Sequence, residues 1–192
     1  MKLLEKMIIE HGEMREGGIL KVDSFLNHQI DIGLYNEIGK EFARLFCDKK
    51  INKILTIEAS GIGIACVTAQ YFNNAPVVFA KKADSKNLDN DVYSTTIHSY
   101  TKGKDYTVRV AKKYINPDDR ILIIDDFLAN GEAVLGLMRL IDEAGAAVEG
   151  VGICIEKYFQ PGGEKILSRG VELHSLALVD IKDNGEIKFI ER

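Results

Sequence analysis

Runs of apolar residues, separated by polar turns, divide the chain into strand-like and helix-like segments. Several short runs show no polar alternation, which is typical of strands buried on both faces of a parallel sheet. Strands of this kind are predicted at 54–57, 76–80, 121–124 and 146–155. Two later segments, 176–179 and 186–190, predict short strands at the margin of the sheet.

Helical spacing lies between these strands. Over 31–47, one apolar stripe contains Tyr35, Ile38, Phe42 and Leu45, and we expect it to pack on the core. Two more helices are predicted, one ending near Phe72 and one over 131–144 with Gly145 in the C-capping position. Strands that alternate with helices predict an α/β fold, in which a mostly parallel central sheet binds ligands at its carboxyl edge.

Residues 81–117 interrupt this alternation. Val92–His98 and Tyr106–Ala111 alternate in side-chain character around a polar turn, which predicts a two-stranded ribbon. An excursion of this length inside a compact domain is typical of a functional lid. The alternative is a hairpin with no role at the site.

Composition narrows the class of protein. The 192 residues are 46% hydrophobic and carry a formal net charge of −4, which suits one globular domain and argues against a nucleic-acid-binding surface. No apolar run approaches the roughly 20 residues of a membrane span. Residues 1–10 have acids among the apolar positions, which favours an amphipathic helix over a signal peptide and indicates a cytoplasmic protein. Cys47, Cys66 and Cys154 are expected to be core thiols.

The most informative segment is 121–133. Asp125 and Asp126 come directly after a buried strand, and a turn through Ala129, Asn130 and Gly131 then leads into a helix. A helix N-terminus and the free N–H groups of such a turn can hold a phosphate, while the carboxylates can accept hydrogen bonds from ribose hydroxyls. The pattern therefore favours a sugar-phosphate site. An ordinary strand-to-helix unit with a solvated Asp pair is the alternative.

A second candidate loop follows the strand at 54–57. Ser60, Gly61 and Gly63 let the backbone approach an anion closely. The loop has neither a Walker lysine nor a complete dinucleotide fingerprint, so a tight strand-to-helix corner remains open from these residues alone. Lys81 and Lys82 follow the next strand and are placed to add positive charge, although they could equally be a solvated pair.

The apolar strand, the two acids and the small-residue loop resemble the 5-phosphoribosyl pyrophosphate (PRPP) motif of type I phosphoribosyltransferases. Asp-Asp-Phe-Leu-Ala-Asn-Gly is similar to the variant in bacterial xanthine phosphoribosyltransferases. Most of the family carries threonines in this loop, whereas Asn130 and Ala133 stand there in this chain. The resemblance therefore implies a 5′-phosphate held mainly by the backbone of a cradle formed by Ala129, Asn130, Gly131, Glu132 and Ala133.

The resemblance extends along essentially the whole chain. Its specific segments are 19–31, 54–61, 76–82, 121–133 and 153–162. It implies the type I phosphoribosyltransferase fold, with a small hood built from the N-terminal arm and the C-terminal segment and a flexible lid loop over 84–116. It also implies that Ser60 and Gly61, with Lys81 or Lys82, bind the pyrophosphate, and that Asp125 and Asp126 hold the ribose.

The resemblance also implies the reaction and its purine. Leu20, Asn27 and Lys157 match the positions that bind the base, and Lys157 suits an oxo-purine because an ammonium group only donates hydrogen bonds. The implied reaction joins xanthine to PRPP, with Mg²⁺ bound through PRPP and no organic cofactor, in a homodimer. Guanine or hypoxanthine as the base, or a non-catalytic PRPP-sensing regulator of the same fold, are the alternatives.

Overall fold

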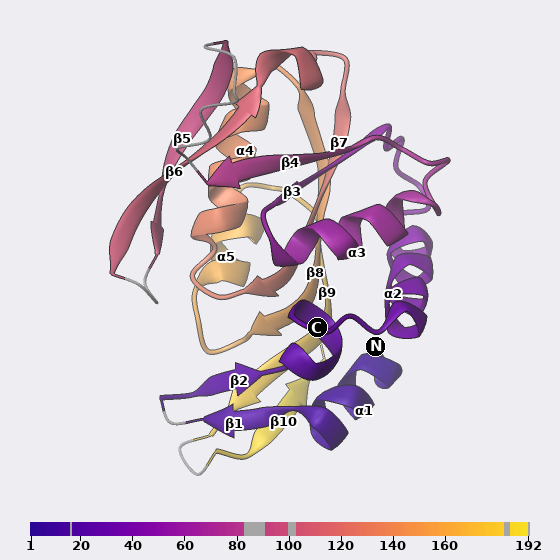
Figure 1. The fold of residues 1–192 in the computed structure, drawn as a ribbon, viewed down its shortest axis with the longest axis vertical. Helices are drawn as coiled ribbons and strands as arrows, with labels where there is room; N and C mark the ends of the chain where they lie inside the picture. The colour runs from indigo at the N-terminus through magenta and orange to yellow at the C-terminus, as the bar shows by residue number, and fades with distance from the viewer. Residues whose placement is uncertain (16, 83–90, 100–102, 183–184, 192) are drawn as a thin grey trace.

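The structure is a computed structural model that describes residues 1–15, 17–82, 91–99, 103–182 and 185–191 (Figure 1). Its centre is an eight-stranded sheet with the order β10-β9-β8-β7-β3-β4-β6-β5. The strands are β3 (Lys53–Ile57), β4 (Val77–Lys82), β5 (Val92–Ser99), β6 (Lys104–Ala111), β7 (Arg120–Leu128), β8 (Ala147–Lys157), β9 (Leu173–Ile181) and β10 (Ile187–Ile190). The five from β9 to β4 pair in parallel, whereas β10, β6 and β5 join antiparallel. The predicted α/β fold with a mostly parallel sheet is confirmed.

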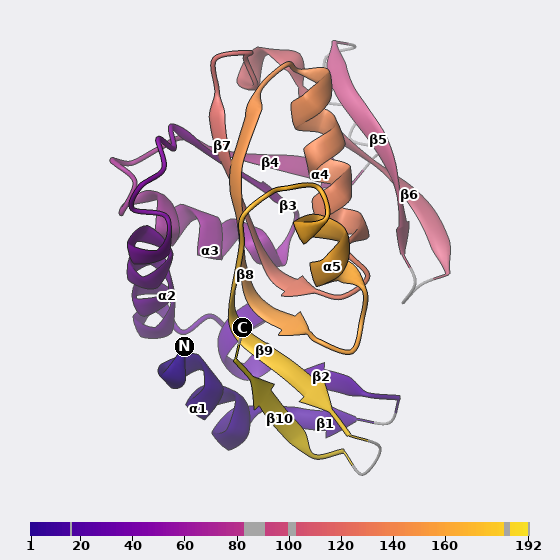
Figure 2. The same ribbon diagram turned by 180° about the vertical axis from the view of Figure 1, so that it is seen from behind.

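Helices cover both faces of this sheet. They are α1 (Lys2–His11), α2 (Ile32–Leu45), α3 (Ser60–Ala69), α4 (Glu132–Glu143) and α5 (Gly162–Leu167). Helices α2 and α3 lie on one face, and α4 and α5 lie on the other (Figures 1 and 2). Strand β7 alternates between the two resulting cores, because Leu122 and Ile124 pack on the first side and Ile121 and Ile123 on the second. This double burial explains why the strand has no polar alternation.

The strand order reverses direction between β3 and β7. From β3 the chain crosses to β4 on one side, and after the ribbon it returns to β7 and continues through β8 to β9 on the other side. Ligands of open α/β sheets bind at such a switch point, outside the carboxyl ends of the strands. Helices α3 and α4 both begin at this edge, since each directly follows one of the two strands.

The N-terminal and C-terminal segments lie together at one end of the molecule (Figures 1 and 2). The hairpin β1 (Glu13–Arg15) and β2 (Ile19–Lys21) leads into a short π-helical turn, η1 (Asp23–Asn27). The N-terminal ammonium group donates a hydrogen bond to the carbonyl of Leu176 on β9. These are the two segments from which the hood is predicted.

The predicted ribbon is also confirmed. Strands β5 and β6 pair antiparallel from Val92 with Ala111 to Ser99 with Lys104, and a 3₁₀ turn, η2 (Lys112–Tyr114), follows. The parts of the predicted 84–116 lid at 84–90 and 100–102 lie outside the described residues.

Some details differ from the sequence-based expectations. Strand β7 runs on to Leu128, so Asp125 and Asp126 lie within the strand and not after it. Cys154 is buried as predicted, but Cys47 and Cys66 are exposed, because apolar sequence neighbours do not determine which way one side chain points.

Helix α5 and the hairpin β1–β2 were not predicted, since six- and three-residue elements are too short to show periodicity. Within the part of the chain that the structure describes, no helix is long and apolar enough to cross a membrane.

Candidate active site

Asp125 and Asp126 are buried at the carboxyl end of β7, with 5% and 8% of their surfaces exposed. The backbone N–H of Asp126 donates to Oδ1 of Asp125 at 3.0 Å. Burial, followed by the adjacent carboxylate of Asp126, raises the pKa of Asp125 well above its ordinary value. Two buried carboxylates at the switch point are suited to accept hydrogen bonds from vicinal hydroxyls, which would replace the water that these groups have lost.

The turn after β7 has the geometry of an anion cradle. Gly131 has a φ of +84° and caps the N-terminus of α4, a conformation that glycine adopts without steric cost. An added Cβ at Gly131 would lie 3.1 Å from Cα of Gly162, so the turn also packs tightly against the start of α5. The N-terminal N–H groups of α4 have no helical partner and carry the positive end of the helix dipole, which favours a phosphate.

The loop at 58–61 approaches the same acids from β3. A Cβ on Gly61 would come within 2.1 Å of Thr56 Oγ1 and 3.1 Å of Asp125 Oδ1, so only glycine fits there. Among the described residues, none offers buried Thr56 Oγ1 a hydrogen-bond partner. Ser60 opens α3, which gives this loop a second helix N-terminus beside the first. The structure thus places Gly61 close to Asp125, with Ser60 next to it at the start of α3.

Strand β4 extends through Lys81 and Lys82, so the two lysines end the strand and do not follow it as predicted. Successive residues of a strand point to opposite faces. The Nζ of Lys82 lies 5.4 Å from the ring centre of Tyr106, and its charge acts on Asp125, whose pKa it lowers as a minor influence. The Nζ of Lys81 lies 5.9 Å from the ring centre of Phe79. The backbone N–H of Lys82 donates to the carboxylate of Glu58, which ties β4 to the 58–61 loop. Of the two lysines, Lys82 is therefore the one directed toward the acids.

The residues predicted to bind the base come from the hood and from β8. Asn27 donates through Nδ2 to Oδ2 of Asp126 at 2.9 Å, which joins the N-terminal arm to the acids. Tyr35 of α2 holds the arm by donating its hydroxyl to the carbonyl of Leu26. Lys157 ends β8, beside β7, and burial lowers its pKa. Leu20, on β2, is 5% exposed and packs within the hydrophobic core.

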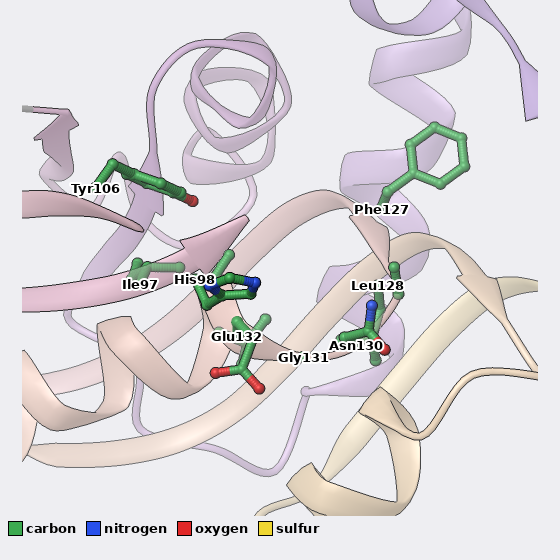
Figure 3. Close-up of a pocket in the computed structure, with 11 residues that line it drawn as sticks. Ile97, His98, Tyr106, Phe127, Leu128, Asn130, Gly131 and Glu132 are labelled. Carbon is green, nitrogen blue, oxygen red and sulfur yellow. The ribbon is translucent and has the colours of Figure 1, made fainter. Parts of the chain in front are cut away.

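The ribbon supplies one wall of a pocket of about 180 Å³ over the cradle. Figure 3 shows Ile97, His98 and Tyr106 projecting from the ribbon on one side, with Leu128 and Asn130 on the other. Nδ1 of His98 lies 2.6 Å from Oδ1 of Asp105 on the paired strand. Sequence reasoning missed His98 and Tyr106, because alternation identifies a ribbon strand without showing what that strand faces.

The oxygen donors at the carboxyl edge of the sheet determine whether a metal ion fits the site. In the described portion of the chain, no group of three or more His, Cys, Asp or Glu side chains is arranged to hold a metal ion. The oxygen donors at this edge are the carboxylates of Asp125 and Asp126. Carboxylate pairs together with phosphate oxygens are the donor set that Mg²⁺ prefers, and the ion commonly arrives with the phosphate ligand. The donors present thus fit Mg²⁺ carried by a polyphosphate.

Comparisons with known proteins agree with this geometry. A phosphoribosyl transferase domain model matches residues 23–158. A xanthine phosphoribosyltransferase from Ruminiclostridium cellulolyticum is 55% identical over 191 residues, covering 100% of both chains. One from Clostridioides difficile is 58% identical over 189 residues, covering 98% of this chain and 100% of the relative. One from Lachnoclostridium phytofermentans is 62% identical over 180 residues, covering 94% and 92%.

Solved structures agree on the fold. An adenine phosphoribosyltransferase from Thermoanaerobacter pseudethanolicus superposes with a TM-score of 0.76 at 21% identity, covering 91% of this chain and 97% of the other. An APRTase from Giardia lamblia complexed with 9-deazaadenine gives 0.75 at 22% identity, covering 90% and 96%. At such identities the likeness concerns the fold, which is that of type I phosphoribosyltransferases. With the full-length identity to the relatives above, the chain belongs to the xanthine phosphoribosyltransferases of the phosphoribosyltransferase family.

Proposed function

We propose that the protein transfers the 5-phosphoribosyl group of PRPP to N9 of xanthine, which gives xanthosine monophosphate (XMP) and pyrophosphate in purine salvage. The observation that carries the proposal is the meeting of three segments at one switch point. Buried acids on β7 stand between two helix N-termini, and Asn27 of the hood contacts one of those acids. Relatives of 55–62% identity with the same stated activity support the choice of purine.

Each segment has a role in this reaction. Asp125 and Asp126 accept hydrogen bonds from the ribose hydroxyls, and the cradle at 129–133 binds the 5′-phosphate. Ser60 and Gly61, with Lys82 or Lys81, bind the pyrophosphate. Loss of pyrophosphate from C1 develops oxocarbenium-like charge, and the purine N9 attacks from the opposite face. The protein therefore acts mainly by orienting the two reactants and by stabilising the negative charge on the leaving group.

The base site sets the choice of purine. Asn27 can donate and accept, so it can bind a ring edge that presents a carbonyl beside an N–H. Lys157 only donates, and its partial burial increases the gain from a carbonyl partner. Leu20, on β2 of the arm, supports the apolar side of the base. Xanthine has two carbonyls and fits these donors, whereas adenine would set an exocyclic amine against Lys157.

The remaining features of the proposal follow from the family and the composition. Mg²⁺ bound through PRPP would offset the charge of the pyrophosphate. We also propose a single domain over residues 1–192, a homodimer, the commonest symmetric assembly of soluble proteins, and a cytoplasmic location. The ribbon is proposed to act as a lid, because His98 and Tyr106 face the cradle.

Product analysis tests the proposal against a PRPP-binding regulator. The protein is incubated with PRPP, Mg²⁺ and xanthine, at a protein concentration far below the concentrations of the two substrates. We expect XMP and pyrophosphate to appear in equal amounts, over many turnovers. Binding of PRPP with no XMP formed would instead favour the regulator.

A further inference from the structure

The segment that follows Lys157, the lysine proposed to bind the purine (the base lysine), returns to the phosphate cradle. Helix α5 begins at Gly162, five residues after Lys157, and its first N–H donates to the carbonyl of Ala129 at 3.0 Å. A Cβ on Gly162 would lie 2.3 Å from that carbonyl oxygen and 2.9 Å from the nitrogen of Gly131. The start of α5 and the cradle are thus in direct backbone contact.

Lys165, on the same short helix, binds the cradle a second time. Its Nζ donates to the carbonyl oxygen of Asn130 at 2.9 Å and to Oε1 of Glu132 at 2.9 Å. The side chains of Lys165 and Glu132 are 36% and 24% exposed, so this ion pair is partly shielded from water. The ammonium group therefore holds the residues on both sides of Gly131.

The hydrogen bonds that Lys165 donates to Asn130 and to Glu132 both favour an anion in the cradle. A carbonyl that pointed into the cradle would repel a phosphate, and the hydrogen bond from Lys165 fixes the Asn130 carbonyl on the α5 side. The carboxylate of Glu132 lies in the first turn of α4, where it competes with a phosphate for the positive end of the helix dipole. Lys165 neutralises that carboxylate, so the dipole and the free N–H groups remain available to the phosphate.

We propose that Lys165 is a positioning residue for the 5′-phosphate of PRPP. It acts through the Asn130 carbonyl and the Glu132 carboxylate, and it couples the segment after the base lysine to the phosphate cradle. This inference rests on the proposed function, because it takes residues 129–133 as the site of the 5′-phosphate.

The test uses ligands that report on the two phosphate sites separately. Ribose 5-phosphate probes the cradle, inorganic pyrophosphate with Mg²⁺ probes the 58–61 loop, and PRPP probes both. Calorimetry compares the wild type with Lys165→Ala, Lys165→Gln and Lys165→Arg. Lys40→Ala is the matched control, because Lys40 also pairs with a glutamate on a helix but is exposed on α2. Thermal melts check that each variant is folded.

We expect Lys165→Ala to weaken ribose 5-phosphate and PRPP binding roughly tenfold, the effect of losing one charge-assisted hydrogen bond. Pyrophosphate binding and the KM for xanthine should stay within about twofold, and Lys165→Arg should recover most of the PRPP affinity. Lys165→Gln keeps a hydrogen-bond donor without the charge, on a side chain one atom shorter, and we expect it to fall between Ala and Arg. Unchanged ribose 5-phosphate affinity in folded Lys165→Ala and Lys165→Gln would overturn the inference, and so would an equal loss of pyrophosphate affinity.

Gly131→Val separates this inference from the assignment of the cradle. Its control is Gly17→Val, which also places a side chain at a positive φ but meets nothing within 4 Å. If folded Gly131→Val still binds ribose 5-phosphate, the cradle assignment is wrong and this inference falls with it. If Gly131→Val loses the ligand while both Lys165→Ala and Lys165→Gln keep it, only the role of Lys165 is wrong.

Discussion

The side-chain amide of Asn27 donates a hydrogen bond to Oδ2 of Asp126 at 2.9 Å, across 99 positions of the sequence. In the proposed reaction these residues serve different substrates, since Asn27 binds the purine and Asp126 binds the ribose. The hydrogen bond occupies an acceptor that a ribose hydroxyl would use. The amide that should bind xanthine is therefore engaged with Asp126 until PRPP displaces it.

This relationship predicts opposite effects of Asn27→Ala on the two substrates. The KM for xanthine should rise about tenfold or more, because a hydrogen bond to the base is lost. The affinity for PRPP should stay the same or increase, because Asp126 no longer has a competing partner. Steady-state kinetics and calorimetry measure both. Gln29→Ala is the control, since Gln29 lies on the same arm and donates to the carbonyl of Ser24 instead. A loss of PRPP affinity in Asn27→Ala would contradict the exchange.

Asp125→Asn and Asp126→Asn should each lower turnover strongly while leaving the fold intact. An amide offers one acceptor oxygen where a carboxylate offers two, and losing a charge-assisted hydrogen bond to a buried hydroxyl costs roughly 1.5–3 kcal/mol.

Asp125→Asn should also stabilise the ligand-free protein. The pKa of Asp125 is raised in the folded state. The contribution of the protonated Asp125 carboxyl to stability is therefore fully present below the ordinary pKa of about 4, and it is lost as the pH rises through the raised value.

The measurement is the free energy of unfolding of both variants between about pH 4 and pH 8. An asparagine cannot ionise, so the stability of Asp125→Asn should exceed that of the wild type by a margin that grows with pH. Asp118→Asn, at an exposed position, serves as the control. Wild-type PRPP kinetics in both active-site variants would refute the ribose assignment, and a margin that shrinks with pH would refute the account of the Asp125 pKa.

The ribbon should become more protected from hydrogen exchange when PRPP and an unreactive purine are both bound. Arg139 of α4 already holds β5, through Nε to Thr95 Oγ1 at 2.9 Å and through a second nitrogen to the Thr96 carbonyl at 3.0 Å. We therefore expect the larger change in the half of β6 that contains Tyr106, which lines the pocket. Equal exchange in the free and bound states across β6 would argue against a lid.

Lys157→Ala should raise the KM for the purine much more than the KM for PRPP. The ammonium group is partly buried on β8 and has lost hydration, so a carbonyl of the base replaces interactions with water. Lys188→Ala, at an exposed position on β10, is the control. If Lys157→Ala left the purine KM and the purine preference unchanged, the base site would be wrong even with a correct PRPP site.

Much of the fold could be predicted from the sequence, because central strands and amphipathic helices carry strong local patterns. The unbroken apolar run before Asp125 predicted a strand buried on both faces, and Asp31 caps α2 by accepting from the N–H of Leu34 at 2.9 Å. The positive φ of Gly145 likewise agrees with its predicted capping position. These features depend on neighbours in the sequence.

Contacts between distant segments could not be predicted in this way. The hydrogen bond from Asn27 to Asp126, the contacts of Lys165 with the cradle and the position of His98 all depend on how elements pack. Helix α5 has six residues, too few for periodicity to reveal it. One local signal was available, since Pro161 and two glycines before Lys165 are typical of a tight turn into a helix.

The most direct test of the central claim is the kcat/KM of the wild-type protein for each purine at saturating PRPP and Mg²⁺. Donors at Asn27 and Lys157 leave buried polar groups unpaired when the base lacks matching carbonyls, which can discriminate by several kcal/mol. We predict that xanthine has the highest kcat/KM, that guanine and hypoxanthine follow, and that adenine is hardly used. Turnover of adenine at a rate equal to that of xanthine would contradict the account.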